Sequence, residues 1–220
     1  MPYLNLLVGE GYRLDHSPLV IAQERGSEGF SLHGGNVDAR GRHVPQLQYT
    51  CAHGDIVNSL IAVSFQLTDA GAGDGGFCVV RGSHKMSFPP SEAMMSGLDS
   101  EFLETCVEQP ETRAGDVIIF SEATVHGALP WTAEHQRRIA LYRFAPANLA
   151  FARGYAEGWP EAHTEGMTPA QLAVMQKPFH PTYDRSVLRV DADGQVQVVV
   201  NARSEAKKSF DRLVFGTAYF

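Results

Sequence analysis

Two histidines and a pair of arginines have the types and order expected of a site that holds both a metal ion and an anion. His33 precedes two glycines, and His126 follows a short apolar run of the kind that forms a strand. Arg137 and Arg138 open the next such run. A neutral imidazole can bind a divalent metal, and a guanidinium can hold a carboxylate through two parallel hydrogen bonds. On these residues alone, an alternative is a hairpin with a hydrogen-bonded histidine and solvated arginines.

The elements that would position these side chains are short strands. Apolar runs with turn residues between them lie at 55–69, 77–80, 116–120, 139–142 and 196–200. Residues 55–69 are predicted to form one central strand, and Gly71–Gly76 to turn it back as a hairpin into 77–80. Many strands with few helices predict an all-β fold, a jelly roll or cupin-like barrel. Because strand ends meet at the mouth of a jelly roll, His33 and His126 are expected to lie close together.

Composition and charge narrow the class of partner. The 220 residues are expected to form a single domain, 1–220, and no apolar run is long enough for a membrane span. A net charge of −7 without a large basic block argues against nucleic acid and membrane partners and favours a small-molecule substrate. The first residues lack the pattern of an export signal, so a cytoplasmic location is expected. The substrate and the oligomeric state are not specified.

Four segments resemble the phytanoyl-CoA dioxygenase (PhyH) family of Fe(II)/2-oxoglutarate oxygenases. They are LHGG at 32–35, VSFQLTDAGAGDGGFCVVRGSHK at 63–85, RAGDVIIFSEATVHGALPW at 113–131 and FDRLVFGTAYF at 210–220. The resemblance implies a double-stranded β-helix that uses Fe(II), 2-oxoglutarate and O2. It further implies that His33 and His126 are metal ligands and that Arg137, rather than Arg138, binds the far carboxylate of 2-oxoglutarate. Trp131 and Arg138 are candidates for the substrate pocket.

The chain departs from the family pattern at two places. The family's first ligand motif is His-x-Asp, and Gly35 stands here where the carboxylate is expected. In related non-haem iron halogenases a glycine or alanine at this position leaves room for chloride, so halogenation is one alternative to hydroxylation. In a second alternative Asp38 or Asp55 supplies the carboxylate, and in a third the chain is a catalytically degenerate binding module. The family's usual N-terminal segment is also expected to be missing before Tyr3.

Overall fold

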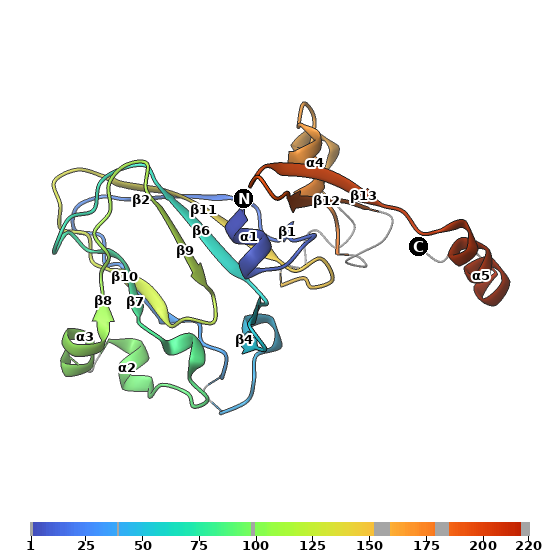
Figure 1. Cartoon of the computed structure of the whole chain (residues 1–220). Helices are drawn as coiled ribbons and strands as arrows, with labels where there is room; N and C mark the ends of the chain where they lie inside the picture. The colour runs from blue at the N-terminus through green and yellow to red at the C-terminus, as the bar shows by residue number, and fades with distance from the viewer. Residues whose placement is uncertain (1, 39, 98–99, 152–158, 179–184, 217–220) are drawn as a thin grey trace.

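Two antiparallel sheets form the body of the protein. The computed structural model describes residues 2–38, 40–97, 100–151, 159–178 and 185–216. The larger sheet has the order β1-β11-β6-β9, with β2 also paired to β11, and the smaller has the order β3-β10-β7-β8. The strands are β1 (Arg13–Leu14), β2 (Leu19–Gln23), β3 (Phe30–His33), β6 (Ile61–Gln66), β7 (Gly76–Val80), β8 (Val107–Glu108), β9 (Val117–Ser121), β10 (His126–Leu129) and β11 (Arg137–Ala145). This is the predicted jelly roll (Figure 1).

Two details of the predicted strands are wrong. The run 55–69 is not one strand: β5 (Asp55–Asn58) pairs with β4 (Tyr49–Ala52) in a separate hairpin, and β6 begins at Ile61. The Gly71–Gly76 turn does not close a hairpin either, because β6 belongs to the larger sheet and β7 to the smaller. A jelly roll repeatedly passes the chain between sheets, so neighbouring apolar runs need not pair.

The remaining elements are a second hairpin and short helices. The hairpin joins β12 (Arg185–Val190) and β13 (Val196–Asn201). The helical segments are α1 (Pro2–Leu7), η1 (Pro45–Leu47), η2 (Ser83–Lys85), α2 (Glu92–Ser96), α3 (Ser100–Cys106), η3 (Glu161–His163), α4 (Pro169–Val174) and α5 (Glu205–Phe215). Within the described ranges, none is a long apolar helix that could span a membrane.

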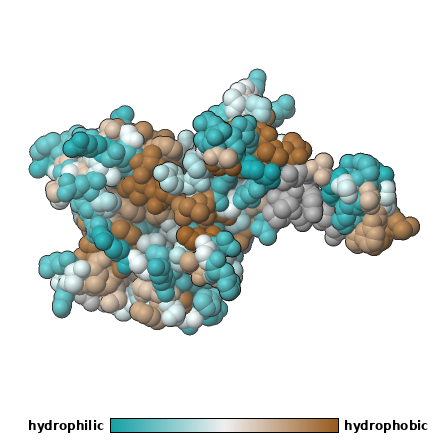
Figure 2. Space-filling model, in the orientation of Figure 1, coloured by the Kyte–Doolittle hydropathy of each residue, from teal (hydrophilic) through white to brown (hydrophobic). Residues whose placement is uncertain are grey.

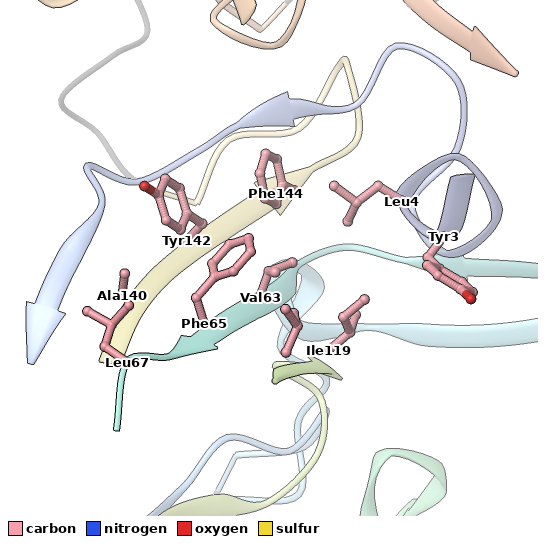
Figure 3. Close-up of a pocket in the computed structure, with 10 residues that line it drawn as sticks. Tyr3, Leu4, Val63, Phe65, Leu67, Ile119, Ala140, Tyr142 and Phe144 are labelled. Atoms are coloured by element: carbon pink, nitrogen blue, oxygen red, sulfur yellow. The ribbon is translucent and has the colours of Figure 1, made fainter. Parts of the chain in front are cut away.

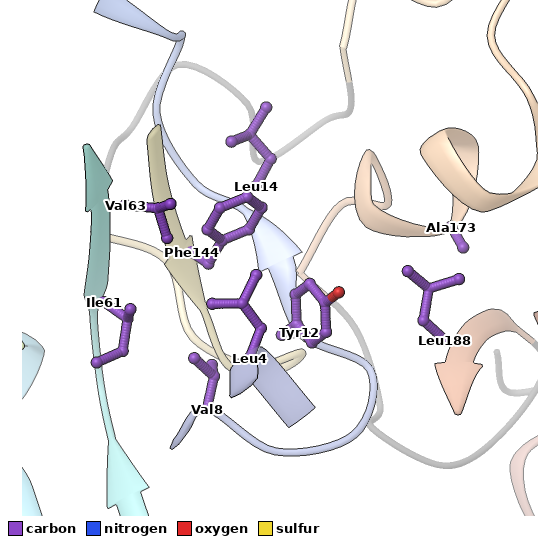
Figure 4. Close-up of a cluster of buried hydrophobic side chains, with 9 residues drawn as sticks. All are labelled: Leu4, Val8, Tyr12, Leu14, Ile61, Val63, Phe144, Ala173 and Leu188. Carbon is purple, nitrogen blue, oxygen red and sulfur yellow. The ribbon is translucent and has the colours of Figure 1, made fainter. Parts of the chain in front are cut away.

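The main core lies on one face of the larger sheet. Figure 4 shows side chains from α1, β6 and β11 packed with others from α4 and β12. The cluster comprises Leu4, Val8, Tyr12, Leu14, Ile61, Val63, Phe144, Ala173 and Leu188. On the smaller sheet, buried Leu32, Cys78 and Val125 pack against residues of α2 and α3. Helices therefore cover part of both outer faces and leave the inner faces opposed.

The side chains of β11 alternate between two spaces. Arg137, Ile139, Leu141 and Arg143 line a cavity between the sheets. Ala140, Tyr142 and Phe144 point to the opposite face and line an open apolar depression of about 920 Å³ (Figure 3). Figure 2 shows the corresponding hydrophobic surface over the middle of the larger sheet. Because strand side chains alternate with period two, this register decides which residues can reach the inner cavity.

Candidate metal and anion site

His33 and His126 lie next to each other on neighbouring strands of the smaller sheet. His33 is the last residue of β3 and His126 the first of β10, and the two are direct partners in the antiparallel register. Their ring centroids are 4.2 Å apart, with an angle of 53° between the rings. The prediction that the fold brings these two histidines together is therefore confirmed. His126, however, opens its own strand instead of lying near the end of the preceding one.

Both imidazoles are held by the same type of backbone contact. The Nδ1 atom of His33 lies 3.0 Å from the carbonyl oxygen of Ser31, and that of His126 lies 2.7 Å from the carbonyl oxygen of Thr124. A carbonyl oxygen can only accept, so each Nδ1 carries the proton and donates. In the neutral rings, both Nε2 atoms then present a lone pair. Metal-binding histidines are commonly fixed by such a contact through the other ring nitrogen.

Aromatic side chains surround the histidine pair. Phe30 contacts His33 edge-on at 5.0 Å between ring centroids, and Phe120 contacts His126 at 4.8 Å. His126 is buried, and this burial is the main cause that lowers its pKa; the charge of Glu122 acts in the opposite direction. The neutral form, which is the form that binds a metal, is thereby favoured.

The two glycines after His33 are required by the backbone. Gly34 and Gly35 have φ values of +88° and +90°, a region that side chains other than glycine rarely adopt. A Cβ on Gly34 would lie 2.6 Å from the carbonyl oxygen of Thr124. At Gly35 the space is open, with Val125 at 3.6 Å, so backbone strain rather than crowding disfavours an aspartate there.

Arg137 lies inside the same cavity. It is 4% exposed, and its Nη1 donates to the Gln23 side chain at 2.6 Å. Its Nε has no hydrogen-bond partner, and no carboxylate pairs with it among the residues that the structure describes. Burial lowers its pKa. The absence of a side chain on Gly76 makes room for the guanidinium, since a Cβ there would lie 2.6 Å from Nε. A buried unpaired guanidinium suits an anionic ligand.

The other predicted site residues lie elsewhere. Arg138 is exposed on the opposite face of β11, where its Nε contacts Gln136. Trp131 is fully buried and donates from Nε1 to the carbonyl oxygen of His135 at 2.6 Å. Neither lines the cavity between the sheets.

Asp38 and Asp55 are not positioned beside the histidines either. Nη2 of Arg42 donates to the Asp38 carboxylate at 2.7 Å, and the Arg42 hydrogen bonds hold the pKa of the Asp38 carboxyl at about 2. Asp55 is exposed at the end of the β4–β5 hairpin. Across the described part of the chain, no group of three histidine, cysteine or acidic side chains is already gathered as a metal site.

The cavity has a volume of about 350 Å³ and combines a polar end with apolar walls. Besides His33, His126 and Arg137, its lining includes Arg143. Glu122 contacts both His126 and Arg143. Sequence reasoning missed Arg143, although counting by twos along the strand from Arg137 leads to it. Glu122 carried no such signal, because it lies in the turn between β9 and β10.

Fold and cavity together define a double-stranded β-helix that presents two imidazoles and a guanidinium in one pocket. The family model for phytanoyl-CoA dioxygenase (PhyH) matches residues 23–139, more than half of the chain. The chain belongs to this family. No curated protein sequence matches it.

Crystal structures of HygX from Streptomyces hygroscopicus are similar to the chain. The structure with nickel and 2-oxoglutarate bound has a TM-score of 0.61 and 26% identity, and covers 69% of this chain and 63% of HygX. The structure with nickel, 2-oxoglutarate and hygromycin B has a TM-score of 0.60, 26% identity, and coverages of 69% and 63%. The iron-bound structure has a TM-score of 0.59, 26% identity, and coverages of 68% and 64%. The chain thus spans less than two thirds of HygX.

Proposed function

We propose that the protein is an Fe(II)/2-oxoglutarate-dependent oxygenase that oxidises an aliphatic C–H bond of a small molecule. The observation that carries the proposal is the pairing, in one cavity, of two imidazoles whose Nδ1 atoms donate to backbone carbonyls with a guanidinium that has no counter-ion among the described residues. His33 and His126 would hold the metal, and Arg137 would bind the far carboxylate of 2-oxoglutarate. HygX, which binds iron or nickel and 2-oxoglutarate, supports this combination.

Iron and 2-oxoglutarate, when bound, supply the activation of O2 that C–H oxidation requires. The protein's own residues bind and orient the reactants and exclude water. The Nδ1 contacts of the histidines fix the direction of both Nε2 atoms, and Phe30 and Phe120 pack against the two imidazole rings. The cavity, about 350 Å³, is at the lower end of the about 300–1,000 Å³ typical of small-ligand pockets. A small-molecule substrate is consistent with this size and with the net charge of −7.

Hydroxylation and halogenation remain two outcomes of the same proposal. One interpretation of Gly35 is halogenation, because a glycine two residues after His33 provides no carboxylate ligand and would leave a coordination position for chloride. The backbone at Gly35 gives a different reason for the glycine, since its φ of +90° disfavours an aspartate in any case. The glycine by itself therefore does not specify which group is transferred.

Anaerobic titration of the protein with Fe(II) and 2-oxoglutarate tests the proposal. The visible charge-transfer band of the iron complex is expected in the wild type and in His43→Ala, a change at an exposed histidine outside the cavity. His126→Ala is expected to lose the band. An unchanged band in His126→Ala would refute the site assignment, and no band in the wild type would favour a binding module without iron.

A further inference from the structure

We infer that Glu122 supplies the carboxylate ligand that is missing two residues after His33. This inference rests on the proposed metal site and deepens it. Glu122 follows β9 directly and is 6% exposed. Its Oε2 atom lies 3.5 Å from Nε2 of His126, the nitrogen that is left free for a metal.

The contact between Glu122 and His126 brings two acceptors face to face. With the proton on Nδ1, the Nε2 atom of His126 has only a lone pair to offer to the carboxylate oxygen. The separation of 3.5 Å also exceeds the usual hydrogen-bond range of about 2.7–3.2 Å. Two ligand atoms that each lie about 2.1 Å from one ion are separated by about 3.0 Å at a right angle and about 3.4 Å at a tetrahedral angle. The observed separation is slightly longer, so the two atoms would have to approach a little to share an ion, whereas their lone pairs do not permit a direct hydrogen bond.

Arg143 holds Glu122 in the orientation that this role requires. Its Nε donates to Oε1 of Glu122 at 2.5 Å, which leaves Oε2 directed toward His126. Arg143 faces the cavity because it is six residues from Arg137 on the same strand, an even number. The arginine also neutralises a buried carboxylate that would otherwise be costly to desolvate. Ligating carboxylates are commonly fixed by such hydrogen bonds.

Gly34 explains how the chain can take its carboxylate from another segment. A Cβ at Gly34 would lie 2.8 Å from the carbonyl oxygen of Glu122 and 3.1 Å from Nδ1 of His126. The glycine therefore allows the end of β3 to approach the turn that carries both side chains. The turn between β9 and β10 thus brings the Glu122 carboxylate beside the glycines, although Gly35, two residues after His33, has none. With that coordination position filled by Glu122, the inference favours hydroxylation over halogenation.

Metal binding measured without turnover tests the inference. Anaerobic Co(II) titration, followed by the visible spectrum of the ion, reports affinity and ligand environment. Glu122→Gln is expected to weaken Co(II) affinity by more than about ten-fold, since loss of even an outer partner of a ligand costs about 10- to 100-fold. The matched control is Glu108→Gln, which removes the carboxylate partner of Arg81 at an exposed pair. It is expected to keep the wild-type affinity.

Chemical rescue separates a ligand from a structural residue. In Glu122→Ala, added formate is expected to restore Co(II) affinity, and chloride to change the Co(II) spectrum in the presence of 2-oxoglutarate. The wild-type spectrum should not respond to chloride, which gives a readout that does not depend on a folded variant. Unchanged affinity in Glu122→Gln, or a chloride response in the wild type, would overturn the role of Glu122 and leave the proposed function standing. A wild type that binds no Co(II) would instead overturn the proposed function.

Discussion

Replacing Arg137 with methionine is expected to weaken 2-oxoglutarate binding and to stabilise the protein without ligand. The side chain is 4% exposed, and its Nε has no partner among the described residues, so a ligand carboxylate would pair with a buried cation. Methionine keeps an unbranched side chain of similar reach and removes the charge. Within the described part of the chain, the substitution would remove the hydrogen bond from Arg137 to Gln23.

The magnitudes follow from the burial. Loss of one partner of a buried charge pair costs about 2–5 kcal/mol, which corresponds to about 30- to several-thousand-fold in the dissociation constant of 2-oxoglutarate. Replacing a buried ionic group by an apolar one can stabilise by about 1–4 kcal/mol, and the lost bond to Gln23 offsets about 1–3 kcal/mol of this. A net gain of about 1 kcal/mol would raise Tm by about 2–4 °C.

Calorimetry with Ni(II)-loaded protein measures both effects. At 2-oxoglutarate concentrations of 100 times the wild-type Kd, the wild type should gain about 2.7 kcal/mol, or about 5–10 °C in Tm, whereas Arg137→Met should gain no more than about 0.9 kcal/mol, the value for a 30-fold weaker Kd. Arg138→Met is the matched control, because the neighbouring residue makes the same chemical change on the opposite face of β11. Wild-type affinity in Arg137→Met, or an equal loss in Arg138→Met, would refute the assignment. A marked fall in the Tm of Arg137→Met would show that the guanidinium stabilises the fold.

Two further predictions concern the backbone and the response to acid. Gly34→Ala should lower Tm by more than about 4 °C, because the new Cβ would lie 2.6 Å from the Thr124 carbonyl oxygen in addition to the cost of a φ of +88°. Gly41→Ala is the control, since Gly41 has a φ of +74° but open space around it, and it should lower Tm less. Equal losses of Tm in the two variants would exclude the role of crowding. The Arg42 hydrogen bond lowers the pKa of Asp38 from 3.8 to about 2, so its contribution to stability is present above about pH 4 and lost as the pH falls toward 2. In Arg42→Gln, NMR titration should show the Asp38 pKa returning toward 3.8, and an unchanged value would contradict this cause.

The fold class and the histidine pair followed from the sequence because both depend on local patterns. Short apolar runs with turn residues predicted the strands, and the convergence of strand ends in a jelly roll predicted that His33 and His126 meet. The pairing of strands was less predictable. The chain after β6 could pair β7 with β6 in a hairpin or carry β7 to the other sheet. Packing between the sheets decides between these connections, and the Gly71–Gly76 segment suits both.

The family resemblance favours Arg137 over Arg138, and the register of β11 gives the physical reason. The structure places Arg137 in the cavity, while Arg138 faces outward. Among candidate carboxylate donors, Asp38 is five residues from His33, and Asp55 follows His53 in a His-x-Asp triplet. Glu122 lies 89 positions from His33 in the chain, and only the meeting of β3 with the turn before β10 brings it close. Contacts between distant segments of this kind leave no trace in local spacing.

The alternation along β11 also limits how the length of this protein can vary. Arg137 and Arg143 both face the cavity only because an even number of positions separates them, and β2 and β6 pair with the strand on its two sides. One residue inserted between the two arginines would turn one of them toward the apolar depression and separate the anion-binding end of the cavity from the histidine end. Insertions and deletions are therefore expected to be excluded from the strand.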